Sequence, residues 1–297
     1  PATLSKEKLR FYKKAGINRF SVGLQSADDK MLKSLNRIHT AKDFIETAEI
    51  LKGENFSADV MIGLENQTAA DVRKTIDLAE SCGAKHISCY ALKPEEGTIM
   101  YGKYLNGDLP SADEVADLYD DAVAYLRSKG YRRYEVSNFA KDGYYSRHNM
   151  NYWRRGEYIG FGVAASSFIG ERRFTNTEKI DEYTACILRG KVAEIFSENI
   201  EGDEREFEFI MLGLRTADGI SFEDYTADIP SDVKIDNELR DAVFRLPIKL
   251  RSVIVLYYIE GYSVEETAYM LKLPQGTVKS RLHKARKLLK TMLDDEI

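Results

Sequence analysis

A basic stripe near the C-terminus is the first group of residues in this sequence that could do chemistry, by binding the phosphates of a nucleic acid. From residue 272 to residue 290 the chain has no Asp or Glu and carries these basic side chains: Lys272, Lys279, Arg281, Lys284, Arg286, Lys287 and Lys290. The formal net charge of the whole chain is −5, so the stripe stands against an acidic background. Such a local positive charge is typical of nucleic-acid-binding proteins. A solvated helix face would carry the same charges, so charge alone leaves both alternatives open.

Two polar residues at the ends of expected strands form a second candidate group. Gln25 ends an alternating run that starts at Phe20, and Asp59 opens the apolar run that ends at Ile62. Polar residues at strand ends are frequent site residues in α/β folds. Asp59 is the stronger candidate because a carboxylate within an apolar strand needs a partner. A structural ion pair with a nearby Lys or Arg is the alternative.

The elements that position the basic stripe are expected to be four short helices. Their predicted ranges are 237–246, 248–259, 263–271 and about 275–293. Pro247 suits the first position of the second helix, and Gly261 suits its C-terminal end. Ser263 and Glu266 have the spacing of a capping box that starts the third helix. A short turn followed by a basic last helix predicts a helix-turn-helix.

The last helix divides into two faces at a period of 3.6 residues. One face is apolar and should pack on the other helices; its members are Val278, Leu282, Ala285 and Leu289. A second face should point toward the base edges of a major groove, with Thr277, Lys279, Ser280, His283 and Lys284. At its flanks Arg281, Arg286 and Lys287 are expected to contact phosphates, which position a protein without specifying sequence.

The first 225 residues alternate between expected strands and helices. Strands are predicted at 20–25, 59–62, 87–92 and 134–139, and helices at 5–15, 41–51, 69–82 and 111–130. Thr68 should cap the third of these helices, and Ser111 with Glu114 should cap the fourth. This rhythm indicates parallel βαβ units, and hence part of a barrel or of a doubly wound sheet.

Composition places the chain among ordinary globular proteins. Its 297 residues, 43% hydrophobic and 31% charged, suffice for two domains. No apolar run approaches the ~20 residues of a membrane helix. Because no signal-peptide pattern opens the chain, a cytoplasmic location is the default expectation. The cysteines at positions 82, 89 and 186 match neither a disulfide framework nor a metal site, so we expect no metal ligands.

The tail LPIKLRSVIVLYYIEGYSVEETAYMLKLPQGTVKSRLHKARKLL resembles region four of bacterial sigma factors, especially the extracytoplasmic-function group, and GTVKSRLHKARK is its most specific part. The resemblance implies that the last helix reads the promoter −35 duplex and that the domain docks on RNA polymerase core. By position, Lys279, Ser280, His283 and Lys284 would be the readers. Region two has no counterpart, so promoter opening by this chain alone is not expected.

Six stretches before the tail resemble the HemW proteins, relatives of oxygen-independent coproporphyrinogen III oxidase in the radical S-adenosylmethionine (SAM) superfamily. They are AGINRFSVGLQS, LNRIHT, ADVMIGLENQT, YEVSNFA, RHNMNYW and EYIGFGVAASSF. The resemblance implies a partial (β/α) barrel and a haem chaperone. It also implies that Gln25, Arg37 and Asp59 hold S-adenosylmethionine, with Arg37 on its carboxylate and Asp59 on its ribose hydroxyls.

The same resemblance singles out His148. This residue lies in an H-N-x-x-Y-W sequence that corresponds to a segment proposed for haem handling in the family, and imidazole is a common axial ligand of haem iron. A surface histidine stacked beside Tyr152 and Trp153 is the alternative.

The defining C-x-x-x-C-x-x-C motif of radical SAM enzymes is absent from the sequence. We therefore expect no [4Fe–4S] ligands, no catalytic residues and no radical catalysis by this chain alone. The opening PATLSKEKL resembles the interior of the family's E-x-N-P-x-T segment, which predicts a truncated start.

Together these features predict a chimeric chain. An α/β partial (β/α) barrel of radical SAM type would occupy residues 1–225, a linker 226–234, and an all-α helix-turn-helix domain 235–297. We expect the tail to bind promoter −35 duplex DNA and RNA polymerase. The alternative is a haem- or S-adenosylmethionine-binding protein of tetrapyrrole metabolism in which the tail is incidental. Whether the fusion is natural or arose in gene assembly stays open.

Overall fold

The computed structural model describes residues 1–221, 242–243, 245–259 and 262–294. Contacts between residues divide the chain into two compact units, Pro1–Tyr145 and Ser146–Ile297, which are described separately. None of the described helices is both long and apolar enough to cross a bilayer.

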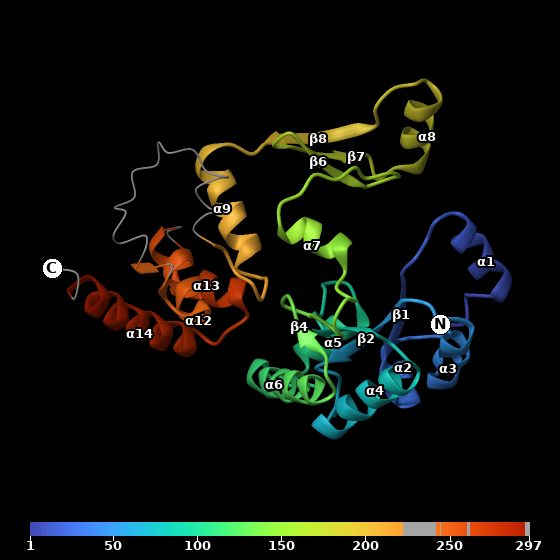
Figure 1. Cartoon of the computed structure of the whole chain (residues 1–297), viewed down its shortest axis with the longest axis horizontal. Coiled ribbons are helices and arrows are strands. Elements are labelled where there is room, and N and C mark those ends of the chain that lie inside the picture. The colour runs from blue at the N-terminus through green and yellow to red at the C-terminus, as the bar shows by residue number, and fades with distance from the viewer. Residues whose placement is uncertain (222–241, 244, 260–261, 295–297) are drawn as a thin grey trace. The chain divides into compact units, whose positions relative to one another are not determined.

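Unit 1 is built on a sheet in the order β1-β2-β3-β5-β4. Figure 1 labels β1, β2 and β4 of this sheet. Its strands are β1 (Phe20–Gln25), β2 (Phe56–Ile62), β3 (His86–Ala91), β4 (Arg132–Arg133) and β5 (Asn138–Ala140). The first three strands are parallel, which confirms the predicted βαβ units, whereas β5 is antiparallel to both β3 and β4.

The predicted strand at 134–139 is confirmed only at residues 138 and 139, which lie in β5, and is wrong for residues 134–137. Residues 134–137 turn the chain between two short strands instead. The Tyr134 N–H donates to the Asn138 carbonyl at 3.2 Å, and the Glu135 carboxylate accepts from the Ser137 N–H at 3.0 Å. Local hydrogen bonds of this kind compete with the pairing of an extended strand.

Six helices accompany this sheet in the described part of unit 1: α1 (Lys6–Lys14), α2 (Asp29–Ser34), α3 (Ala41–Ile50), α4 (Ala69–Ser81), α5 (Ile99–Leu105) and α6 (Ala112–Ser128). The predicted caps are confirmed, because Thr68 forms a capping box with Asp71 and Ser111 forms one with Glu114. Each box satisfies N–H groups that the first helical turn leaves unpaired.

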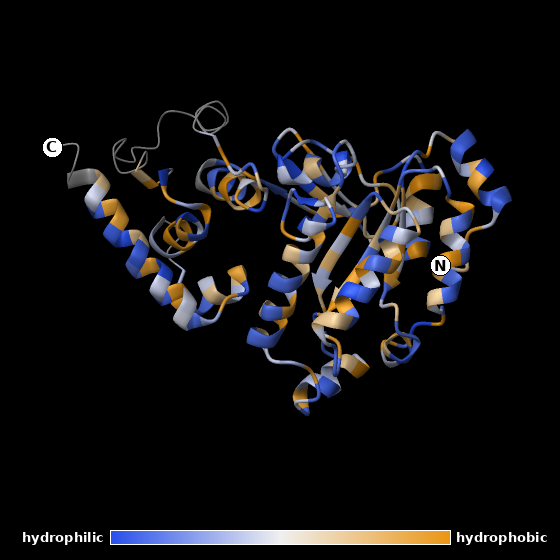
Figure 2. Ribbon diagram, turned by 60° about the horizontal axis from the view of Figure 1, so that its bottom comes forward, coloured by the Kyte–Doolittle hydropathy of each residue, from blue (hydrophilic) through white to orange (hydrophobic). Residues whose placement is uncertain are grey.

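The two faces of the sheet differ in polarity. Apolar side chains of β2 and β3, such as Val60 and Ile87, pack against α3, α4 and α6 in one buried core. Figure 2 shows apolar and polar residues alternating around the helices, as amphipathic helices require. The opposite face, here called the inner face, carries alternate polar residues such as Ser57, Asp59 and Ser88. Side chains of successive strand residues point to opposite faces, so the pattern follows from the sequence.

Unit 2 begins with α7 (Arg147–Trp153) and an antiparallel sheet in the order β6-β7-β8. The strands are β6 (Ser166–Ile169), β7 (Arg172–Asn176) and β8 (Glu194–Asn199), with α8 (Ile180–Leu188) between the last two. The helix α9 (Gly202–Gly213) follows β8.

The C-terminal elements of unit 2 are α12 (Ile248–Ile254), the π-helix η1 (Val255–Ile259), α13 (Val264–Leu271) and α14 (Gln275–Asp294). The Ser263–Glu266 capping box is confirmed. Pro247 is the N-cap of α12 rather than its first helical residue, and the predicted continuous second helix changes to π geometry at Val255. The predicted stop at Gly261, most of the predicted first helix and the predicted linker lie outside the described residues.

The apolar face predicted for the last helix is confirmed. Its four members are buried in one core with residues of α12 and α13: Val278, Leu282, Ala285 and Leu289. The same core includes Ile210 of α9 and Ile220, with Phe209 and Leu214 packed against it. The C-terminal helices thus share their core with α9.

Truncating this core should destabilise the C-terminal helices. We expect Leu282→Ala, at a side chain 4% exposed, to lower their free energy of unfolding by about 2–5 kcal/mol. Lys287→Ala, at an exposed position of the same helix, should change it by less than ~0.5 kcal/mol. Urea titration, with amide hydrogen exchange of α14 as the probe, measures the change in the free energy of unfolding of each variant. Equal changes for the two variants would contradict the assigned packing.

Candidate functional site

Asp59 lies at the centre of a polar cluster on the inner face of the unit 1 sheet. It stands in register with Ser88 of β3, and the Ser21 hydroxyl of β1 donates to its Oδ1 at 3.2 Å. Burial raises the pKa of Asp59, against the opposing effects of hydrogen bonds from Ser21 and Ser88 and of the charges of Arg19 and Arg37. Folding therefore favours the protonated form of this carboxyl.

Gln25 closes the cluster at the end of β1. Its φ is +66°, and the register between β1 and β2 shifts immediately before it. The Tyr90 hydroxyl of β3 donates to Gln25 Oε1 at 3.1 Å, so this hydrogen bond spans the intervening strand β2. A Cβ at Gly23 would come within 2.9 Å of Gln25 Nε2, so a larger residue there would displace the amide.

Arg37 completes the group from the segment after α2. Its side chain is exposed, and its positive charge acts on the carboxyl of Asp59 and the hydroxyl of Tyr90. Burial is the main cause that raises the pKa of Tyr90, and the charge of Asp59 adds to it. The structure thus brings together Gln25, Arg37 and Asp59. Asp59 has no cation within 4.0 Å among the described residues, unlike the structural ion pair considered as the alternative.

Sequence reasoning missed three members of the cluster: Ser21, Ser88 and Tyr90. The alternation of side chains along a strand could have found them. Ser21, Gly23 and Gln25 are alternate residues of β1 and so share one face. Ser88 and Tyr90 of β3 likewise alternate with the buried residues Ile87 and Cys89.

The Asp59 cluster fits the polar parts of S-adenosylmethionine. A guanidinium suits a ligand carboxylate, and the half-buried carboxyl of Asp59 suits ligand hydroxyls, which can donate to it. The cysteines offer no comparable fit to an iron–sulfur cluster, since Cys89 is buried in the helix-covered core. Among the described residues no three His, Cys, Asp or Glu side chains gather in a way that could hold a metal ion.

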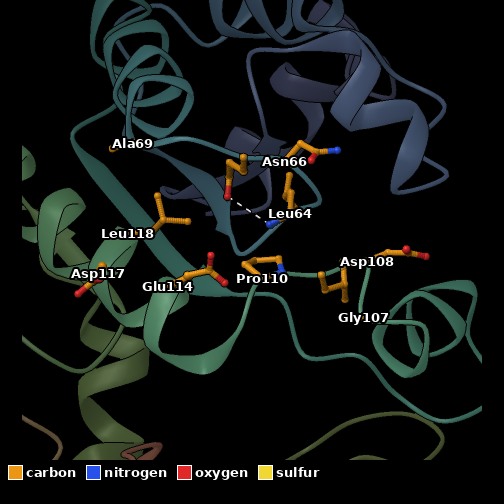
Figure 3. A pocket seen from close by; sticks show the side chains of 11 residues that line it. Leu64, Asn66, Ala69, Gly107, Asp108, Pro110, Glu114, Asp117 and Leu118 are labelled. Carbon is orange, nitrogen blue, oxygen red and sulfur yellow. Dashed lines mark hydrogen bonds between the residues drawn. The ribbon is translucent and has the colours of Figure 1, made fainter.

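A separate pocket of about 530 Å³ lies in unit 1 between the loop after β2 and the start of α6 (Figure 3). Gln67 shapes its wall, because its Oε1 accepts from the backbone N–H groups of Gly63 and Leu64 at 2.8 and 3.2 Å. Glu114 and Asp117 give it acidic character. None of the residues predicted to bind a ligand lines this pocket.

His86 is a buried histidine on the inner face. Its side chain is fully buried, and its Nε2 lies 2.7 Å from the Tyr134 hydroxyl. Burial lowers the pKa of His86 to about 3, with a smaller contribution from the charge of Arg19. The imidazole is therefore neutral at physiological pH.

Neutral burial of His86 makes unit 1 sensitive to acid. A histidine with a lowered folded-state pKa stabilises the fold above its unfolded value of 6.5, and this stability is lost as pH falls toward about 3. We expect the loss to be on the order of a few kcal/mol and to be smaller in His86→Gln. Urea titrations of both chains at several pH values measure it; an identical pH dependence would contradict the neutral, buried state.

The recognition face predicted on α14 is open to solvent. Lys279, Ser280, His283 and Lys284 are exposed, whereas Thr277 and Arg281 are partly buried. The Ser280 hydroxyl donates to the Thr277 carbonyl at 2.9 Å. The basic side chains thus lie on the side of α14 away from the buried stripe.

His148 is exposed near the start of α7, in unit 2. Its ring meets Tyr152 edge-on, with centroids 4.8 Å apart and an angle of 88° between the planes. Tyr152 in turn contacts Tyr158 edge-on at 4.7 Å. The imidazole is accessible to a ligand, and its aromatic surroundings equally suit a surface histidine, which was the alternative.

Comparison with known proteins agrees with the resemblances found for both parts of the sequence. Residues 1–79 match the family model of the Radical SAM superfamily, and residues 236–289 match that of Sigma-70, region 4. The chain thus combines a region similar to radical SAM proteins with a segment similar to sigma-70 region 4. Both matches fall where the sequence motifs placed them.

Curated relatives cover the HemW-like region. The chain is 35% identical over 226 residues to the heme chaperone HemW of Bacillus subtilis (strain 168), an alignment that covers 74% of this chain and 60% of that protein. It is 35% identical over 246 residues to HemW of Haemophilus influenzae, covering 79% and 62%. The HemW-like chain therefore spans about 60% of the length of these relatives.

The solved structure of coproporphyrinogen III oxidase (HemN) from Escherichia coli, a radical SAM enzyme, matches the HemW-like chain with a TM-score of 0.66. The match covers 88% of this chain and 62% of that one at 16% identity, so it concerns the fold. It confirms the predicted α/β partial barrel of radical SAM type. The α-helical C-terminal region is consistent with the predicted helix-turn-helix.

Proposed function

We propose that the C-terminal helices bind duplex DNA through the exposed face of α14. The separation of its two faces supports this proposal: the apolar stripe is buried in the core, and the basic face is open. In a helix-turn-helix the last helix enters the major groove, where side chains reach base edges. Lys279, Ser280, His283 and Lys284 would read bases, with Thr277 and Arg281 beside them.

The similarity to sigma-70 region 4 supports a specific DNA target and a second partner for this proposal. The duplex would be a promoter −35 element, and the helices would also contact RNA polymerase core. The exposed Arg286 and Lys287, further along α14, would contact phosphates. We further propose the limits 1–225 for the HemW-like region, 226–234 for a linker and 235–297 for the DNA-binding domain, and a cytoplasmic location.

Fluorescence anisotropy with the full chain tests DNA binding. A labelled −35-like duplex is compared with a scrambled duplex of equal length over a series of salt concentrations. We expect tighter binding to the −35-like duplex and an affinity that falls steeply with salt, because released counterions drive phosphate contacts. Equal, salt-insensitive binding to both duplexes would reject the proposal.

The Asp59 cluster supports a second candidate function, the binding of S-adenosylmethionine by Gln25, Arg37 and Asp59. When bound, that cofactor would supply a sulfonium group. The residues of this chain would hold its carboxylate and hydroxyls through charge-assisted hydrogen bonds. Catalysis is not part of this proposal.

Haem binding at His148 is the further part of this second candidate. In a haem titration followed by absorbance, His148→Ala should abolish the spectrum of an imidazole-ligated haem if His148 is an axial ligand. His283→Ala, which removes another exposed histidine, should leave the spectrum unchanged. Identical spectra for the parent chain and His148→Ala would remove His148 as a ligand.

A further inference from the structure

Four polar side-chain atoms of unit 1 are buried without a hydrogen-bond partner in the described part of the chain. They are Arg19 Nε, Asn55 Oδ1, His86 Nδ1 and Asn138 Oδ1. Leaving such an atom unsatisfied costs about 1–3 kcal/mol. Several of them in one region require a partner there, either ordered water or a bound ligand.

These atoms belong to side chains of one face of the sheet. His86 and Asn138 lie on the inner face, since they alternate with Ile87 and Phe139 of the helix-covered core. In the antiparallel pair β3–β5, Asn138 stands opposite Ser88, which makes it a diagonal neighbour of His86, with about 7–8 Å between Cα atoms. Arg19 precedes Phe20, which pairs with Phe56 of β2, and the next residue of β2, Ser57, pairs with His86 of β3. The charge of Arg19 acts on both His86 and Asp59.

The orientation of His86 is fixed by its surroundings. Its Nε2 is bound to the Tyr134 hydroxyl at 2.7 Å, and the two rings meet at 63° with centroids 5.6 Å apart. Tyr134 is itself stacked on Tyr145 at 4.4 Å. The fully buried imidazole cannot turn toward solvent without breaking these contacts, so Nδ1 stays directed at the same place.

The charges favour an anion at this place. Arg19 has no carboxylate within 4.0 Å among the described residues. When His86 Nε2 accepts from the Tyr134 hydroxyl, Nδ1 carries the proton and is a donor. A carboxylate matches this set, because its two oxygens can accept from the planar guanidinium and from the imidazole. The negative charge that Asp59 can carry on the same face disfavours a ligand with two negative charges.

We propose that Arg19 and His86 form a second ligand site on the inner face, which binds the carboxylate of a small monocarboxylic acid. Asn138 borders the site, and a 180° turn of its amide offers the ligand an NH2 donor in place of Oδ1. The site is separate from the S-adenosylmethionine contacts assigned to Gln25, Arg37 and Asp59.

Titration of the full chain, labelled with ¹⁵N at histidine, with sodium propionate in place of sodium chloride tests the site. We expect a saturable shift of the His86 ring nitrogen resonances in the parent chain. The shift should be lost in Arg19→Gln and weakened in Arg19→Lys, which keeps the charge and lacks the planar fork. Arg132→Gln, which removes an exposed guanidinium paired with Asp142, should behave as the parent.

Three outcomes would overturn the site. The first is no saturable shift, which would mean that ordered water alone satisfies these atoms. The second is an unchanged shift in both Arg19→Gln and Arg19→Lys, which would remove the guanidinium as a ligand. The third is a His86 shift on adding S-adenosylmethionine that also prevents the propionate shift, because the carboxylate would then be that of S-adenosylmethionine. If Arg19→Gln does not fold, Arg19→Lys decides.

Discussion

Lys284→Ala should weaken binding of the full chain to a −35-like duplex by about tenfold. Loss of one good base contact costs about 1–3 kcal/mol, and each 1.4 kcal/mol is a factor of ten. Lys284 lies on the exposed face of α14, one residue before the fully buried Ala285. Its truncation therefore removes a charge without disturbing the core. If the ammonium also neutralises a phosphate, the slope of log affinity against log salt should fall by about one.

Lys6→Ala is the matched control for this experiment, since it removes one exposed positive charge from α1 of unit 1. Affinity and salt slope should remain those of the parent chain. If Lys284→Ala leaves both quantities unchanged, or if Lys6→Ala has the same effect, α14 does not present the reading face.

Asp59→Asn should stabilise unit 1 at neutral pH while reducing its affinity for S-adenosylmethionine by about tenfold or more. Burial raises the pKa of this carboxyl, so between the unfolded value of 3.8 and the folded-state pKa the native state holds a proton that the unfolded chain has released, and at higher pH it carries a half-buried charge. Such a group stabilises the fold fully below its unfolded value of 3.8, and this stability is lost as pH rises through the folded-state pKa. The amide of Asp59→Asn cannot ionise, so the variant does not lose this stability as pH rises. The hydrogen bond from a ligand hydroxyl to a charged carboxylate, worth about 1.5–3 kcal/mol, is lost as well.

Thermal unfolding of unit 1 and calorimetric titration with S-adenosylmethionine measure the two halves of this prediction. Asp121→Asn is a matched control on α6, where the carboxylate pairs with Arg73 and the pKa is lowered rather than raised. This control should not gain stability at neutral pH. A lower melting temperature for Asp59→Asn than for the parent chain would contradict the assigned electrostatics. An unchanged affinity would remove Asp59 from the binding site.

Much of the fold was predictable from short-range patterns. The Thr68–Asp71 and Ser111–Glu114 capping boxes mark where α4 and α6 begin, because the side-chain and backbone groups involved are three residues apart. The buried stripe of α14 follows equally directly from its 3.6-residue period. By contrast, the turn at 134–137 depends on hydrogen bonds that outweigh a β-favouring composition. No sequence pattern marks the π geometry of η1.

The Asp59 site was predictable only in part. The family resemblance selected Gln25, Arg37 and Asp59, and the structure brings them together. The link from Tyr90 to Gln25 depends on strand order, because two residues on strands that flank a third meet only when the sheet is assembled. The fixed imidazole of His86 likewise depends on Tyr134, which is 48 positions away along the chain.

The helix α9 lies in the HemW-like part of the sequence, yet Ile210 is buried in the same core as Val253 and Leu282. The two sequence families therefore meet inside one packed interior, not at a surface. Substitutions on either side of that meeting cannot accumulate independently, because a change of volume at Ile210 must be matched by its neighbours in α12 and α14. Exchanging the sigma-like segment for that of another protein would require α9 to be redesigned with it.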